Sequence, residues 1–231
     1  MRTAPIITID GPAGAGKSTV ARLLADSLGY VLVDTGAMYR AVAFAGRAAG
    51  EDWKDAERMG GVARSLVERG ALAFERAEGI GVRIRIDGVD VTDSIRTPEI
   101  ARGASAVSAH GPVREALLDM QRRAGSGGGV VLEGRDIGTV VFPDAELKFF
   151  LTARPEVRAR RRFAELKARG VEVSYEETLR DVLQRDEQDT TRAVAPLRQA
   201  PDATLVDDSD IGIEETVARM AARARNWSPP A

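Results

Sequence analysis

Residues 11–19 carry the pattern with the clearest chemistry in this chain. Gly11, Gly16, Lys17 and Ser18 match the spacing G-x-x-x-x-G-K-[ST]. In such a loop the glycines let backbone N–H groups point at phosphate oxygens, the lysine reaches the β- and γ-phosphates, and the serine hydroxyl is a ligand for Mg²⁺. The pattern predicts a site for ATP with Mg²⁺ as cofactor. The predicted ATP-binding residues are Gly11, Pro12, Ala13, Gly14, Ala15, Gly16, Lys17, Ser18 and Thr19.

Two other segments place arginine residues where a bound anion is expected. Arg40 ends the sequence D-T-G-A-M-Y-R, which follows the apolar run 30–33, and Arg135 and Asp136 follow the apolar run 130–133. Open α/β sheets bind ligands at the carboxyl ends of their parallel strands, so these side chains are candidates for a second substrate site. A surface arginine or an ordinary salt bridge is the alternative explanation for either segment.

Basic residues also repeat along one face of two predicted helices in the segment 154–192. Pro155 is placed to begin the first helix, and Ser174 with Glu177 forms a capping box that begins the second. Phosphoryl transfer requires cations that arrive around the migrating group when the site closes, so this pair is predicted to be a lid. An exposed, salt-bridged surface is the alternative. The residues that share a face are Arg158, Arg161 and Arg162 on the first helix and Arg185, Asp189 and Arg192 on the second.

The elements that must position these residues are short strands and one amphipathic helix. After the glycine loop, apolar residues recur at helical spacing until Gly29, which predicts a helix from Lys17 to Leu28. Strand, loop, helix and strand form a βαβ unit, whose strands are parallel. The sequence therefore predicts an α/β fold with a five-stranded parallel sheet. The predicted strands are 5–9, 30–33, 130–133, 147–151 and 203–206.

The segment between the second and third of these strands is far longer than a simple crossover needs. In its middle Val82, Ile84 and Ile86 alternate with polar residues, and Asp87-Gly88 turns the chain toward the apolar run 89–91. Residues 71–74 are a candidate third strand. We therefore expect a small antiparallel sheet inserted at about 63–105.

Composition excludes several classes of site. The chain of 231 residues contains no cysteine and a single histidine, and its formal net charge is −2. Disulfides, thiolate zinc sites and a cysteine nucleophile are thereby excluded, and His110 is expected to be structural or exposed in a turn. No signal segment or apolar span of membrane length is evident. We expect a cytoplasmic protein without a nucleic-acid or membrane partner.

The glycine loop alone does not decide between the classes of protein that use it. A guanine-reading N-K-x-D element is ruled out because Asn226 is the only asparagine, so a GTPase is not expected. Large ATPases have a strand that ends in an acidic pair, whereas the strand 130–133 leads into Glu133-Gly134-Arg135-Asp136. That ending favours contacts with a substrate, and hence a small-molecule kinase.

Five motifs in order make the chain resemble the bacterial cytidylate kinases over nearly its whole length. They are G-P-A-G-A-G-K-S-T, D-T-G-A-M-Y-R, I-R-T-P-E-I, E-G-R-D-I-G-T-V-V-F-P-D-A and R-D-x-x-D-x-x-R-A-V-A-P-L. The resemblance implies a three-layer P-loop kinase core over 1–36, 106–153 and 193–231, a CMP-binding subdomain over 37–105 and a helical lid over 154–192. It further implies transfer of the γ-phosphate of ATP to CMP or dCMP by a monomer.

The same resemblance implies a role for individual residues. The cytosine contacts implied are Ser105, Arg114 and Asp136; the sugar contacts are Tyr39, Arg185 and Asp189; the phosphate contacts are Arg40, Arg135 and Arg192. The catalytic group implied is Lys17, Arg135, Asp136, Arg161, Arg185 and Arg192, with Arg161 reaching the ATP phosphates and Ser18 at the metal. Glu133 receives no role. Another small-molecule P-loop kinase, or a non-catalytic nucleotide-binding protein, is the alternative function.

Overall fold

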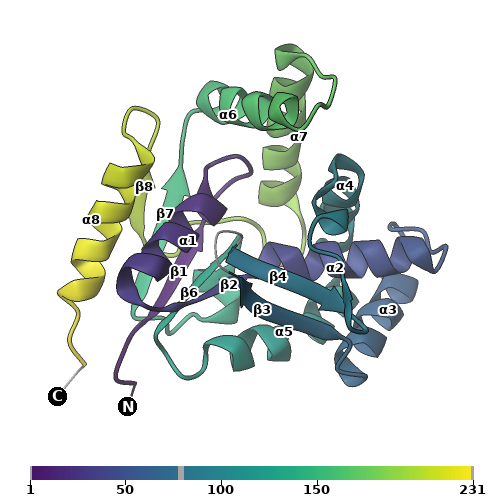
Figure 1. Ribbon diagram of the computed structural model, residues 1–231, viewed down its shortest axis with the longest axis horizontal. Coiled ribbons are helices and arrows are strands. Elements are labelled where there is room, and N and C mark those ends of the chain that lie inside the picture. Colours follow the sequence, from purple (N-terminus) through teal and green to yellow (C-terminus); the bar gives the residue numbers. More distant parts are fainter. Residues whose placement is uncertain (1, 78–80, 230–231) are drawn as a thin grey trace. The chain divides into compact units, whose positions relative to one another are not determined.

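The computed structural model describes residues 2–77 and 81–229, and its contacts divide the chain into two compact units (Figure 1). The first unit comprises the residues up to Tyr30 together with those from Gly128 onward, and the second is Val31–Gly127. Within the described ranges, no helix combines the length and the apolar character that crossing a membrane requires.

The main sheet has five strands in the order β2-β6-β1-β7-β8. Strand β1 pairs in parallel with β6 and β7, and β7 pairs in parallel with β8. Every residue of β1 and β6 is buried, as expected for central strands of a parallel sheet. The predicted α/β fold with a five-stranded parallel sheet is confirmed. The strand bounds are Ile6–Asp10 (β1), Val31–Asp34 (β2), Val130–Gly134 (β6), Leu147–Thr152 (β7) and Thr204–Asp207 (β8).

Among the described residues, the first unit contains the α-helices α1 (Lys17–Leu28), α6 (Pro155–Ala168), α7 (Tyr175–Thr191) and α8 (Ile213–Arg225). Helix α1 has its predicted bounds and ends at Gly29, whose φ of 70° allows its N–H to reach the carbonyl oxygens of Ala25 and Asp26. Helix α8 packs against α1 (Figure 1). The predicted capping box of Ser174 and Glu177 is confirmed at the start of α7.

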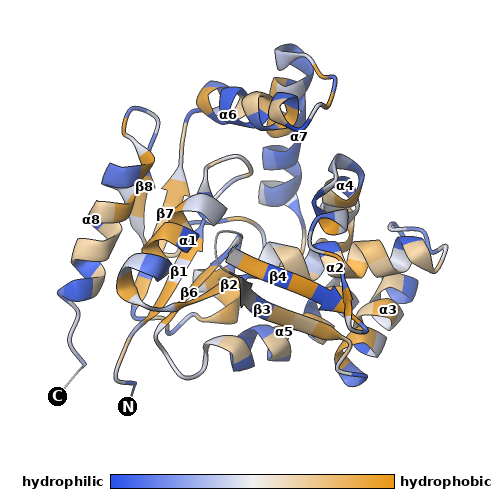
Figure 2. Cartoon of the chain, in the orientation of Figure 1, coloured by the Kyte–Doolittle hydropathy of each residue, from blue (hydrophilic) through white to orange (hydrophobic). Residues whose placement is uncertain are grey.

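A short π-helical turn, η2 (Ile137–Val141), follows β6 and was not predicted. Figure 2 shows β1 and β7 in hydrophobic colours, whereas α7 is largely hydrophilic. Strands β1 and β7 are thus apolar, whereas α7 exposes most of its charged side chains.

The second unit contains the inserted antiparallel sheet. Its strands are β3 (Leu72–Ala77), β4 (Gly81–Ile86) and β5 (Val89–Asp90), in the order β3-β4-β5. The tight turn between β4 and β5 has positive φ at both Asp87 (48°) and Gly88 (80°), as an Asp-Gly hairpin turn requires. The predicted hairpin and its third strand are confirmed, and β3 is longer than predicted.

Besides β2 of the main sheet, the second unit contains the helices α2 (Thr35–Ala48), α3 (Ala56–Glu68), η1 (Ser94–Arg96), α4 (Pro98–Val107) and α5 (Gly111–Gly125). Helices α2 and α4 pack together, as do α3 and α5. The Trp53 ring lies against Gly103 of α4, and its indole N–H donates to the Ala43 carbonyl oxygen at 2.9 Å. Gly103 thus leaves room for the indole ring on α4.

Gly103→Ala is expected to lower the free energy of unfolding by about 1–3 kcal/mol, because overpacking displaces a fixed ring. A Cβ at this position would lie 2.5 Å from the nearest Trp53 ring atom. Gly61→Ala on α3 is the matched control: nothing lies within 4 Å of its Cβ, so alanine should raise stability by about 0.5–1 kcal/mol. Urea unfolding followed by circular dichroism measures both. A Gly103→Ala chain as stable as the control would contradict this packing argument.

Candidate nucleotide-binding site

The glycine loop predicted to bind phosphate joins β1 to α1. A Cβ on Gly11 would lie 1.9 Å from the carbonyl oxygen of Leu151 on β7, so no larger residue fits there. Gly14 and Gly16 have φ values of 75° and 81°, which only glycine adopts readily. These glycines give the loop its tight path, and α1 begins directly after it at Lys17.

Lys17 is buried in this loop, with 5% of its surface exposed. Its ammonium group donates to the Pro12 carbonyl oxygen at 2.8 Å. Burial, reinforced by the positive charge of Arg135, lowers the pKa of Lys17 from its usual 10.5 to about 7. A phosphate group beside the ammonium would favour its charged form, so the loop is suited to an anionic ligand.

Ser18 and Glu133 bring two oxygen-bearing side chains together beside the loop. The Ser18 hydroxyl donates to Oε1 of Glu133, and the Glu133 side chain lies at the end of β6, where it is buried. Hydroxyl and carboxylate oxygens are the hard ligands that Mg²⁺ prefers. In the part of the chain that the structure describes, no group of three or more His, Cys, Asp and Glu side chains could hold a metal ion. A metal here would therefore need further oxygens from a ligand.

Four of the predicted acceptor-site residues form two ion pairs between the end of β6 and the end of α7. Arg135 donates through Nε to Oδ2 of Asp189 at 2.7 Å. Nη2 of Arg192 lies 3.7 Å from Oδ1 of Asp136, and both side chains are buried. Burial opposes the charge on Asp189, but Arg135 outweighs it and lowers the pKa of that carboxyl. The two pairs fix the positions of the Arg135 and Arg192 guanidinium groups.

The C-terminal end of α7 explains how Arg192 is oriented. Arg192 is the C-cap residue, and its Nε donates to the Ala195 carbonyl oxygen at 2.7 Å. Ala195 has a positive φ of 48°, which turns the chain back toward the helix end. Arg185 lies one turn before Asp189, and its charge also lowers the pKa of Asp189. The predicted shared face of α7 is thus occupied by mutually interacting charges.

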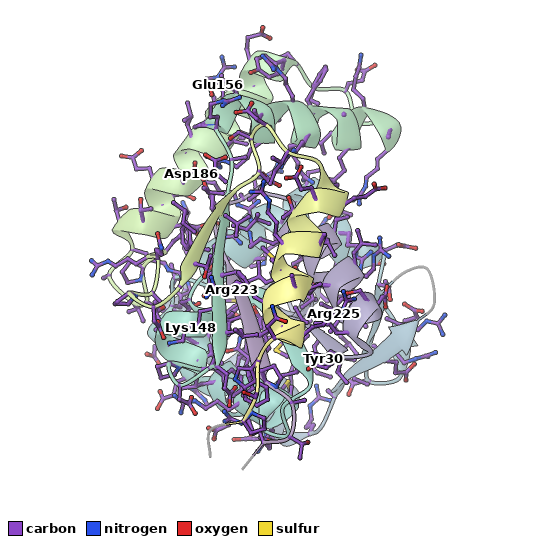
Figure 3. All side chains as sticks on the ribbon, turned by 90° about the vertical axis from the view of Figure 1, so that its left-hand side faces the viewer. Tyr30, Lys148, Glu156, Asp186, Arg223 and Arg225 are labelled. Atoms are coloured by element: carbon purple, nitrogen blue, oxygen red, sulfur yellow. The ribbon has the colours of Figure 1, made fainter. Side chains whose placement is uncertain are left out.

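Arg158 of α6 links the two predicted lid helices to the glycine loop. Its guanidinium donates to both carboxylate oxygens of Asp186 on α7, at 2.9 and 2.6 Å. Nη1 also donates to the Ala13 carbonyl oxygen at 3.0 Å, and only 3% of Arg158 is exposed. Figure 3 shows Asp186 on α7. Arg158 therefore holds loop and helices together in this structure.

The other two arginines predicted on α6 have different partners. Arg161 binds both carboxylate oxygens of Asp208 through Nη1, at 2.9 and 3.0 Å, and a Cβ on Gly16 would lie 3.9 Å from the same nitrogen. Asp208 is almost fully buried beside the loop. Arg162 instead pairs with Glu165 of its own helix at 2.8 Å. Arg161 thus lies near the glycine loop, and Arg162 makes a local surface pair.

The remaining predicted acceptor residues lie in the second unit, where α2, α4 and α5 place them. Tyr39 of α2 and Arg114 of α5 are largely buried, and the guanidinium carbon lies 5.6 Å from the centre of the tyrosine ring. Nη1 of Arg114 donates to the Ser108 carbonyl oxygen at 3.0 Å, and the Ser108 hydroxyl donates to the carbonyl oxygen of Ser105. Arg40 is half-buried on α2. Tyr39 and Arg114 therefore meet within this unit.

His110, the only histidine, lies at the N-cap of α5. Its Nε2 lies 2.8 Å from the Trp53 carbonyl oxygen, and because a carbonyl only accepts, Nε2 carries the proton. The ring connects α5 to the loop before α3, which is a structural role.

Three aspartates of the site were missed by the sequence analysis. Asp10 is buried at the end of β1, Asp186 binds Arg158, and Asp208 binds Arg161. The signal for two of them was present, because Asp10 and Asp208 lie at or just beyond the carboxyl end of a strand. Asp186 is the second residue of the motif R-D-x-x-D-x-x-R, but the motif does not identify its partner, because only the packing of α6 on α7 brings it to Arg158.

A parallel α/β sheet whose central strand leads through this loop into α1 defines a P-loop nucleotide-binding protein. The cytidylate kinase family model matches residues 7–226, and the chain belongs to that family. A cytidylate kinase of Geobacter sulfurreducens is 52% identical over 220 residues, which cover 95% of this chain and 92% of the relative. One of Pelotomaculum thermopropionicum is 50% identical over 223 residues, covering 96% and 97%.

Similarity of fold extends to solved structures with little sequence in common. A crystal structure of an uncharacterized protein from Eubacterium ventriosum superposes with a TM-score of 0.50 at 12% identity, covering 96% of this chain and 99% of that one. The match shows a shared fold and nothing about chemistry.

Proposed function

We propose that the chain transfers the γ-phosphoryl group of ATP to CMP, giving ADP and CDP, and that it also accepts dCMP. The observation that carries the proposal is the pair of ion pairs Arg135–Asp189 and Arg192–Asp136 in the unit that contains the glycine loop. These are the cations that a second polyanionic substrate requires. Membership of the cytidylate kinase family supports the choice of cytidine as the nucleoside.

The donor nucleotide is proposed to bind at residues 11–19. Backbone amides of the loop and the N-terminus of α1 would contact the phosphates, and Lys17 would reach the β- and γ-phosphates. The proximity of Arg161 to Gly16 supports a contact of that guanidinium with the ATP phosphates. Ser18 and Glu133 would hold Mg²⁺ together with phosphate and water oxygens. When bound, Mg²⁺ neutralises charge on the β- and γ-phosphates.

CMP is proposed as the acceptor nucleotide, with the contacts that the family resemblance implies. Arg40, Arg135 and Arg192 would bind the CMP phosphate, because guanidinium groups match phosphate oxygens in charge and geometry. Asp136, Ser105 and Arg114 would contact the cytosine ring. Tyr39, Arg185 and Asp189 would contact the sugar.

Phosphoryl transfer between these sites needs positioning and charge neutralisation more than proton transfer. The CMP phosphate attacks the γ-phosphorus in line, and the bond to the β-phosphate oxygen of ADP breaks. Lys17 and the arginines would offset the repulsion between the two polyanions. The reacting atoms could then be held close together. The transfer requires no covalent enzyme intermediate.

CMP and dCMP are expected to be phosphorylated with kcat/KM at least about tenfold above UMP or AMP, since a site that hydrogen-bonds a base edge rejects bases that leave its groups unpaired. A coupled assay of ADP release with CMP, dCMP, UMP, AMP and shikimate as acceptors measures this. Preference for another acceptor would indicate a different small-molecule P-loop kinase. ATP binding without turnover of any acceptor would indicate a non-catalytic nucleotide-binding protein.

A further inference from the structure

The carboxylate of Asp10 connects the glycine loop to the segment that follows β6. Asp10 ends β1 and directly precedes Gly11, and it is 4% exposed. Its Oδ1 accepts the backbone N–H of Ile137 at 2.8 Å, and its Oδ2 accepts that of Gly138 at 2.7 Å. Each carboxylate oxygen thus accepts a hydrogen bond from one of two consecutive amides, which lie 127 and 128 residues further along the chain.

This carboxylate is unfavourable in its buried position. Both of its hydrogen-bond donors are uncharged backbone groups, and burial raises the pKa of Asp10 to about 6. A buried carboxylate is retained against such a penalty when an uncharged side chain cannot make the same contacts. Asparagine, for example, has one acceptor oxygen where aspartate has two.

The two amides determine how the chain leaves Asp136. The backbone of Asp136 has φ −146° and ψ 25°, and its carbonyl oxygen accepts the N–H of Val140 at 2.9 Å, which closes the turn. Gly138 approaches β1 closely: a Cβ on it would lie 2.9 Å from Oγ1 of Thr8 and 3.4 Å from Oδ2 of Asp10. The turn η2 is therefore held against β1 through a position that has no side chain.

We propose that Asp10 is a positioning residue for the acceptor nucleotide. By holding the amides of Ile137 and Gly138, it sets the direction in which Arg135 and Asp136 extend from β6 and keeps that segment in register with the phosphate loop. The inference rests on the proposed function, because it assumes that Arg135 and Asp136 contact the acceptor. It implies that weakening this contact impairs CMP binding more than ATP binding.

Asp10→Asn tests the proposal, because asparagine keeps the shape but turns an NH₂ group toward one of the two amides. KM for CMP is expected to rise about tenfold, KM for ATP to change less than about twofold, and the amide of Ile137 or Gly138 to exchange its hydrogen faster. Thr8→Ser is the matched control, because it keeps the hydroxyl oxygen that lies beside Gly138. Thr8 is buried, lies on the same face of β1 two residues earlier, and its hydroxyl has no hydrogen-bond partner among the described residues. Neither its KM values nor its amide exchange should change.

Each outcome decides the matter. Unchanged KM for CMP and unchanged exchange in Asp10→Asn would overturn the inference, as would an equal rise in both KM values, which indicates general loosening of the loop. If Asp10→Asn does not fold, Gly138→Ala disturbs the same contact from the other side and should give the same rise specific to CMP. A wild-type chain that does not phosphorylate CMP overturns the proposed function and this inference with it. CMP turnover in the wild type that survives the substitutions unaltered overturns the inference alone.

Discussion

Replacing Lys17 by methionine is expected to lower kcat for CMP phosphorylation by about a thousandfold or more. Methionine keeps much of the length and apolar surface of lysine but removes the charge that would stabilise the migrating phosphoryl group. A coupled assay of ADP release measures the loss. Lys54→Met, at an exposed lysine of the second unit, is the control and should retain wild-type kcat. A Lys17→Met enzyme that keeps a tenth of wild-type kcat would reject the assignment.

The lowered pKa of Lys17 predicts that ATP binding is accompanied by proton uptake, which can be measured on the wild-type chain and on the same variant. Because the pKa of Lys17 is about 7, this side chain is uncharged in most molecules at about pH 8.5 when no nucleotide is bound. Triphosphate beside it would raise that pKa toward the usual value, so ATP binding at this pH should take up close to one proton. Below about pH 6 the side chain is already charged, and this uptake should vanish. Calorimetry in buffers of different ionisation enthalpy measures it, and Lys17→Met should show none.

Arg135→Ala is expected to lower kcat/KM for CMP by at least about tenfold while the chain stays folded. The substitution removes a charge-assisted contact to the acceptor phosphate, and such contacts contribute about 1.5–3 kcal/mol. It also removes the hydrogen-bonded cation of the largely buried Asp189, whose negative charge would then be less well compensated near a polyanion.

The control for Arg135→Ala is Arg160→Ala, which removes an exposed arginine of α6. Steady-state kinetics with CMP varied at saturating ATP should show the loss for Arg135→Ala and no change for Arg160→Ala. Circular dichroism establishes that both chains are folded. If the two variants are equally active, Arg135 has no part in binding the acceptor.

Elements defined by short-range signals could be predicted from sequence. The bounds of α1 follow from the glycine loop before it and from Gly29 after it, and the hairpin of β4 and β5 follows from the Asp87-Gly88 turn. The main strands were predicted with small errors at their ends, where strands fray. By contrast β3 runs to Ala77 because β4 supplies hydrogen-bonding partners along its whole length. The turn η2 depends on Asp10, which is remote in sequence.

In the candidate site, too, some features could be predicted from sequence and others could not. Local sequence patterns predict which residues could contact phosphate, because a glycine loop, a lysine at its end and arginines at strand and helix ends are chemically specific. Tertiary packing sets the partners of two arginines of α6, because Arg158 binds Asp186 and Arg161 binds Asp208, whereas Arg162 binds Glu165 within the same helix. Local sequence sets backbone conformation and the spacing of charges along an element. The choice among many carboxylates depends on which distant segments packing brings within hydrogen-bonding distance.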